Sequence, residues 1–210
     1  MSFVKKIVYS LIKIYSCLYS YSFNQYLRVK FTVIYSIWVS LEFKKFGEKS
    51  TINFEFTLVG GKYITIGNNT NIGVRSVLTA WDKYNNILFQ PEIIIGSNVA
   101  IGDDSNISAI NKIVIGNNVL TGKKVTITDN SHGRSLLELL DIAPSRRDLY
   151  SEGPVHIEDG VWIGDKVTIL PNVRIGKNSI IGANAVVTRD IPSNCVAAGI
   201  PARIIKIIQK

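Results

Sequence analysis

The chain has 210 residues, 46% of them hydrophobic and 19% charged, which argues against disorder and allows one folded domain with an appendage. Its formal net charge is +8, yet the basic residues surround no recognisable nucleic-acid-binding module, so we expect no nucleic-acid partner. The two cysteines show no CxxC spacing and no secretory signal precedes them, which argues against a disulfide framework and a zinc site.

Residues 1–50 are a basic and apolar N-terminal extension that we expect to be mainly helical. Most of the positive charge lies here, because eight basic residues precede residue 50 and only Glu42 and Glu48 oppose them. Two interpretations are open. The basic residues form a solvated face on helices that pack against the rest of the molecule, or residues 1–46 contact an anionic surface such as the headgroups of a bilayer.

The extension lacks the pattern of a membrane span or of a cleavable signal. Its longest uncharged stretch, Ile14 to Leu27, is shorter than the roughly 20 apolar residues that a span requires. Lys13 interrupts the apolar region, and no small-residue cleavage site follows it. We therefore expect a cytoplasmic protein.

Residues 51–208 form a second unit, and from residue 64 onward they repeat every six residues, as in "IGNNTN", "IGSNVA" and "IGKNSI". Twelve of thirteen such units begin with an aliphatic residue, whereas chance would give about four. The first and fifth residues of a unit share one face of a strand, and the Gly, Asn and Asp residues between them favour turns. One unit cannot bury its own apolar face, so successive coils must stack into a parallel β-helix.

Two segments, 79–92 and 133–154, interrupt the repeat and are expected to be loops that leave the β-helix. Loops on a rigid scaffold often carry function, although an insertion can also be a mere decoration. The second loop begins directly after His132, which favours a functional role for it.

The repeats, of the type aliphatic-Gly-x-x-small-x, resemble those of the hexapeptide acyltransferases from about residue 60 to residue 208. The resemblance implies an all-β core that is a left-handed parallel β-helix. Here the helical extension precedes that core, and we expect a short C-terminal helix or tail to follow it. The resemblance also implies a homotrimer with active sites between neighbouring subunits.

The segment "TDNSHG" resembles the one that carries the catalytic histidine in the O-acetyltransferases of this family, which include galactoside, maltose and polysaccharide acetyltransferases. This implies that His132 is a general base that takes the proton of an acceptor hydroxyl, without an acyl-enzyme. Asp129 could orient the imidazole or contact the acceptor, and Asn130 could bind either ligand, but both could instead form a turn. His156 lies outside any such motif, and we interpret it as an ordinary surface or core residue.

The C-terminal third, from "GVWIG" to "AAGIPARIIK", resembles the corresponding part of galactoside and maltose acetyltransferases. The resemblance assigns contacts with the co-substrate acetyl-CoA to Asp165, Ala183, Thr188, Arg189, Arg203 and Lys206. Arginine and lysine suit the CoA phosphates, although a solvated positive rim would have the same composition. Trp162 either walls the acetyl pocket or packs outside the coil, and the Asp165 N–H is the candidate oxyanion donor.

We therefore predict an acetyl-CoA-dependent O-acetyltransferase that acts on a saccharide hydroxyl. Residues 1–50 do not match the galactoside and maltose enzymes. With the loop after His132, they look more like acetyltransferases of bacterial surface-polysaccharide assembly, which favours a position peripheral to the inner face of the membrane.

The alternatives are a chloramphenicol- or streptogramin-type acetyltransferase, an N-acetyltransferase acting on an amino sugar, and a scaffold that has lost the chemistry. A γ-type carbonic anhydrase is disfavoured because it needs three histidines per zinc site and the chain has two. We expect no metal to be required.

Overall fold

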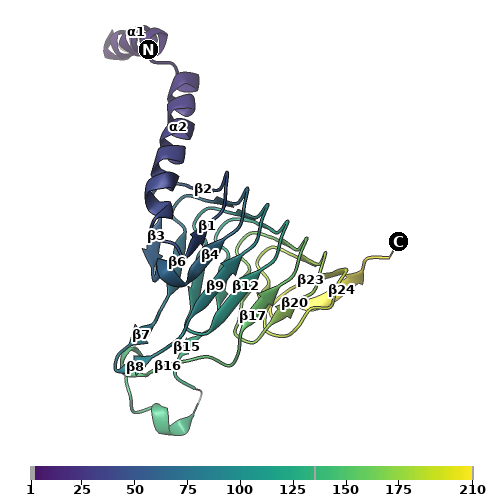
Figure 1. The fold of residues 1–210 in the computed structure, drawn as a ribbon. Helices are drawn as coiled ribbons and strands as arrows, with labels where there is room; N and C mark the ends of the chain where they lie inside the picture. Colours follow the sequence, from purple (N-terminus) through teal and green to yellow (C-terminus); the bar gives the residue numbers. More distant parts are fainter. Residues whose placement is uncertain (1–2, 135, 210) are drawn as a thin grey trace.

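The computed structural model describes residues 3–134 and 136–209. The protein forms a left-handed parallel β-helix that is preceded by two helices (Figure 1). Residues 1, 2 and 135, which fall in the expected extension and in the expected second loop, lie outside the described part. The helices are α1 (Phe3–Leu18) and α2 (Tyr21–Ser40). The fold class expected from the six-residue repeat and from the family resemblance is confirmed.

Three sheets form the three faces of the β-helix. Face 1 contains β1 (Lys45–Phe46), β4 (Ile64–Ile66), β9 (Glu92–Ile95), β12 (Lys112–Ile115), β17 (Val155–Ile157) and β20 (Arg174–Ile175). Face 2 contains β2 (Thr51–Ile52), β5 (Asn71–Ile72), β10 (Ala100–Ile101), β13 (Leu120–Thr121), β18 (Trp162–Ile163), β21 (Ile180–Ile181), β23 (Cys195–Ala198) and β24 (Arg203–Ile207). Face 3 contains β3 (Thr57–Val59), β6 (Val77–Ala80), β11 (Asn106–Ala109), β14 (Thr126–Thr128), β19 (Thr168–Ile169) and β22 (Val186–Val187).

The chain visits the faces in the order 1, 2, 3 in every coil, so like positions of successive coils lie side by side. Ile64, Ile93, Ile113 and Val155 pair in register on face 1 and are fully buried. Such columns of aliphatic side chains fill the interior, because each coil supplies too few apolar atoms to form a core alone. Since β1 belongs to face 1, the β-helix begins within the range assigned to the extension.

The corners between faces explain the glycine and the asparagine of each repeat unit. A Cβ on Gly96 would lie 2.6 Å from the carbonyl oxygen of Gly116 in the next coil, so no side chain fits there. Two residues later, Asn98 has a φ of 57°, a left-handed conformation that asparagine tolerates better than most residues. The repeat therefore encodes a tight corner that is stacked on the next corner.

The two ends of face 2 are covered differently. At the first end α2 covers the edge strand β2, where the Ser36 hydroxyl accepts a hydrogen bond from Ile52 N at 2.8 Å and lies 3.1 Å from Ile52 O. At the last end β24 pairs antiparallel with β23. The C-terminal segment is thus a strand and not the helix or tail that we expected, because β-branched residues there complete the open edge of β23.

Both loops expected from the sequence leave the β-helix at the edge where face 3 passes into face 1, which we call edge 3/1. The first contains the antiparallel pair β7 (Lys83–Tyr84) and β8 (Ile87–Leu88). The second follows β15 (Ser131–His132) and contains β16 (Leu149–Tyr150), which pairs antiparallel with β15. Short 3-10 turns lie at Gly61–Tyr63, Leu137–Leu139 and Pro144–Arg146. The two loops project from the same corner (Figure 1).

We expect Ile113→Ala to lower the free energy of unfolding by about 2–5 kcal/mol, because it leaves a cavity in a column that the flanking coils cannot close. Urea unfolding measures this change. The control is Ile205→Ala, which removes an exposed isoleucine of β24. Equal effects of the two substitutions would contradict the role of the column.

Candidate active site

His132 lies at the end of the fourth coil, where the second loop departs. It is in β15, where it pairs with Leu149, and its side chain is exposed. The ring of Tyr84, from the first loop, meets the imidazole edge-on, with the centroids 5.5 Å apart and the planes at 67°. The histidine is therefore bordered by both loops.

Tyr84 and Asn85 tie the first loop to the second. The Tyr84 hydroxyl donates a hydrogen bond to the Ser145 carbonyl at 3.1 Å, and Asn85 Nδ2 lies 3.5 Å from Asp148 Oδ1. A cavity of about 550 Å³ lies between the loops. Sequence reasoning missed Tyr84, although the spacing of the repeat could have shown that both breaks follow a strand of face 3 and so leave at one edge.

Asp129 and Asn130 hold the corner from which His132 departs. The Asp129 carboxylate is fully buried and accepts hydrogen bonds from Ile110 N and Asn111 N, both at 2.9 Å. Asn130 Nδ2 donates to the Ser108 carbonyl at 3.1 Å and to Asp129 Oδ1 at 3.1 Å. These contacts favour the turn-forming alternative, because a carboxylate without exposed surface meets no acceptor sugar in this conformation.

A row of outward-facing side chains crosses face 2 from Trp162 to the C-terminal strand. Trp162 pairs in register with Ile180, Ile180 with Val196, and Val196 with Lys206. Trp162 is 52% exposed and Lys206 is exposed. Three strand spacings of about 4.8 Å place Lys206 roughly 14 Å from Trp162, and Arg203 begins the same strand, β24.

Asp165 and Ala183 lie one above the other at the edge between faces 2 and 3, edge 2/3. Asn184 N donates to the Asp165 carbonyl at 2.8 Å, and Asp165 Oδ1 accepts from Lys123 N of the coil before at 2.8 Å. Ala183 occupies the same position one coil later, but it has no side-chain oxygen that could accept a hydrogen bond from the Asp165 N–H. Among the described residues this N–H has no acceptor, which leaves the amide open to a ligand.

The sequence-predicted residues thus form two groups on different edges. Trp162, Asp165 and Ala183 lie on face 2 and edge 2/3, whereas Thr188 and Arg189 follow β22 at edge 3/1, the edge that also carries His132. The edges are six residue steps apart along face 3 in the fourth coil, from Lys123 to Asp129, a span of roughly 20 Å at about 3.3 Å per residue. One chain does not bring the two groups together.

His156 lies on face 1, away from both groups, between Val114 and Arg174 of the neighbouring strands. Burial lowers its pKa from the usual 6.5, and the charges of Arg174 and Lys112 act in the same direction. The imidazole therefore favours its neutral form. Within residues 3–134 and 136–209, no cluster of three or more His, Cys, Asp or Glu side chains could hold a metal ion.

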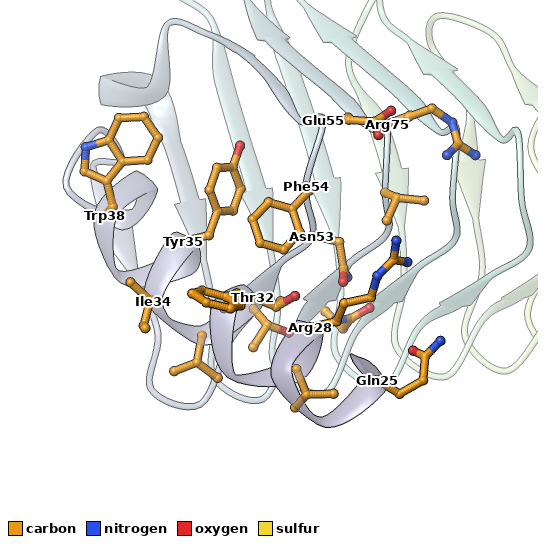
Figure 2. Close-up of a pocket in the computed structure, with 16 residues that line it drawn as sticks. Gln25, Arg28, Thr32, Ile34, Tyr35, Trp38, Asn53, Phe54, Glu55 and Arg75 are labelled. Atoms are coloured by element: carbon orange, nitrogen blue, oxygen red, sulfur yellow. Dashed lines mark hydrogen bonds between the residues drawn. The ribbon is translucent and has the colours of Figure 1, made fainter. Parts of the chain in front are cut away.

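A groove of about 1100 Å³ lies between α2 and the first two coils (Figure 2). Arg28, Tyr35, Phe54 and Arg75 are among its lining residues, and Arg75 is paired with Asp104 at 2.6 Å. It contains none of the sequence-predicted site residues, so it is separate from the candidate active site.

Residues 154–189 match the family described as "Bacterial transferase hexapeptide (six repeats)", and residues 63–79 match "Hexapeptide repeat of succinyl-transferase". The chain is 37% identical over 147 residues to the putative lipopolysaccharide biosynthesis O-acetyl transferase WbbJ of Escherichia coli K12, with 68% of this chain and 71% of that protein covered. It is 39% identical over 124 residues to the galactoside O-acetyltransferase of the same organism, with 54% of this chain and 56% of that protein covered.

The fold is similar to a solved hexapeptide-repeat-containing acetyltransferase, VCA0836 of Vibrio cholerae O1 biovar eltor, which was determined in complex with acetyl-CoA. The TM-score is 0.54 at 28% identity, and 81% of this chain and 74% of that chain are covered.

We expect Asp129→Ala to lower the free energy of unfolding by about 1–3 kcal/mol, because it leaves the backbone amides of Ile110 and Asn111 without their acceptor. Asp141→Ala, which removes an exposed carboxylate, is the control and should change stability little. Urea unfolding of both variants measures the difference. A stable Asp129→Ala variant with a large loss of activity would show instead that the carboxylate serves the imidazole.

Proposed function

Because this chain belongs to the hexapeptide-repeat acyltransferases, we propose that it is an acetyl-CoA-dependent O-acetyltransferase acting on a saccharide hydroxyl in surface polysaccharide biosynthesis. That it is an acyltransferase follows from the family. The related Vibrio cholerae structure with acetyl-CoA supports the acetyl donor. The names of the two Escherichia coli relatives support the saccharide acceptor and O-acetylation.

In this proposal His132 is the general base. Acetyl-CoA supplies the acetyl group as a thioester. His132 accepts the proton of the acceptor hydroxyl as its oxygen forms a bond with the thioester carbonyl carbon, and it passes the proton to the sulfur as the carbon–sulfur bond breaks. The Asp165 N–H donates to the oxyanion between these two steps, a role supported by its lack of an acceptor among residues 3–134 and 136–209.

The row across face 2 is the single observation that carries the donor site. It offers Trp162 to wall the acetyl end and Lys206 for the phosphates, with an apolar strip between them for the pantetheine arm. Arg203 on β24 adds a second cation near Lys206. Thr188 and Arg189 complete the proposed contacts from another subunit, because they lie on the other edge.

The two-edge arrangement supports the homotrimer. If edge 3/1 of one protomer meets edge 2/3 of the next, His132 faces the Asp165 N–H of its neighbour, and a ring of three closes with three equal sites. Face 3, between these edges, presents outward side chains that are mostly small: Thr57, Val77, Asn106, Thr126, Thr168 and Val186. Small side chains allow two copies to approach closely.

The proposal includes contact between residues 1–46 and a membrane surface, where saccharides for surface polymers are assembled on lipid carriers.

A soluble amino sugar or a drug such as chloramphenicol is the competing acceptor. Free-CoA release with a panel of sugars, nucleotide sugars, amino sugars and chloramphenicol, followed by mass analysis of the acetylated product, identifies the acceptor. Transfer to chloramphenicol alone would overturn the saccharide assignment.

We expect His132→Ala to lower kcat on the best acceptor by about 100- to 10,000-fold, because the hydroxyl loses its proton acceptor. Release of CoA in the presence of that acceptor measures the rate. The matched control is His156→Ala, which removes the other histidine and should leave kcat unchanged. Full activity of His132→Ala would end the general-base proposal.

A mixing experiment tests whether the site is shared. His132→Ala chains are co-expressed with chains that carry Arg203→Glu and Lys206→Glu, each type being inactive alone. Random mixing should restore about a quarter of the wild-type activity, because one interface in four then joins an intact His132 to an intact donor groove. No recovery in co-purified mixed oligomers would mean that each site lies within one chain.

A further inference from the structure

The first helix, α1, is amphipathic along its whole length and buries none of its side chains. At 100° per residue nine of its apolar side chains gather on one half of the circumference, namely Phe3, Val4, Ile7, Val8, Leu11, Ile12, Ile14, Tyr15 and Leu18. All nine are between 46% and 83% exposed. The other half carries Lys5, Lys6, Lys13, Ser10 and Ser16 together with Tyr9 and Cys17, so the lysines lie opposite a wide apolar face that the fold leaves uncovered.

The position of α1 keeps this face available. The last turns of α2 pack on β2 through Ser36 and Val39, and α1 lies at the far end of α2, away from the β-helix (Figure 1). Ser20 caps α2 by accepting a hydrogen bond from Phe23 N at 3.1 Å, and the Tyr19 ring lies 5.7 Å from that of Phe23. The turn between the helices is therefore ordered, and it holds α1 at a distance from the coils.

The positive charge around α1 favours an anionic partner for the apolar face. Residues 1–41 contain five basic residues and no acidic one: Lys5, Lys6, Lys13, Arg28 and Lys30. Two copies of this segment would repel each other, whereas an anionic lipid surface would neutralise both. None of the described helices is both long and apolar enough to span a membrane, and 16 residues of α1 extend only about 24 Å.

We propose that α1 lies in the plane of an anionic lipid layer, with the nine-residue apolar face among the acyl chains and the lysines at the headgroups. This proposal rests on the membrane contact included in the proposed function, and it adds the element, the face and the lipid class. A helix with lysines on one face and Phe, Ile and Leu on the other is suited to the interface of a bilayer. The next helix, α2, also carries exposed aromatic and aliphatic side chains.

The test is flotation of the full-length protein with vesicles of phosphatidylcholine and phosphatidylglycerol. Leu11→Asn, on the apolar face, should lower the bound fraction constant about tenfold or more. The control is Ser16→Asn, which also introduces an asparagine but places it on the lysine face and leaves the charge unchanged. This variant should bind like the wild type. Pure phosphatidylcholine vesicles, or Lys6→Gln with Lys13→Gln, should also weaken binding about tenfold.

Equal binding of Leu11→Asn and the wild type would overturn the proposal, and so would equal binding to neutral and anionic vesicles. Sedimentation without lipid tests the alternative that a second copy of the chain covers the apolar face. That alternative would be assigned if the protein bound no vesicles and self-associated in a way that Leu11→Asn abolished. Acetyl transfer to a soluble acceptor is measured on the same variants. A chain that floats but transfers no acetyl group would refute the proposed reaction, not the lipid contact.

Discussion

The stacking of one corner directly on the next is the constraint on which the whole molecule depends. Gly96 N donates to the Ile115 carbonyl at 2.8 Å and Gly116 N to the Ile157 carbonyl at 2.7 Å, so each corner is bonded to the coil that follows. These hydrogen bonds, together with the close approach of the stacked glycines, fix the register of one coil on the next. This fixed register aligns the buried aliphatic columns and, equally, the outward rows that form the candidate donor groove.

The β-helix could be predicted from the sequence because its signal is repeated. The leading aliphatic residue and the following glycine recur in successive units, and each unit indicates an equivalent strand and corner. The C-terminal strand could not be predicted in this way, because residues after "AAGIPAR" follow no hexad and form a strand only when the edge of β23 is available. The same holds for Tyr84, whose contact with His132 depends on two loops that are far apart in the chain.

The individual roles in the candidate site stay predictions that the resemblance supplies, whereas the arrangement of these residues comes from the structure. The resemblance assigned His132, Trp162 and Asp165, and the structure adds that the histidine lies on one edge and the other two on or beside another. It also explains the acidic neighbour of His132: the Asp129 carboxylate is directed inward to the amides of Ile110 and Asn111. A string of letters such as "TDNSH" does not reveal which side chains point into the coil.

The two loops at edge 3/1 have a consequence beyond this site. Val114 pairs with His156, 42 residues later, as regularly as His156 pairs with Arg174, 18 residues later. The pairing of the strands therefore does not depend on the number of residues inserted at that corner. Segments of very different length can be exchanged there in evolution or by design without disturbing the row of side chains across face 2, so the loops that border His132 can diversify independently of that face.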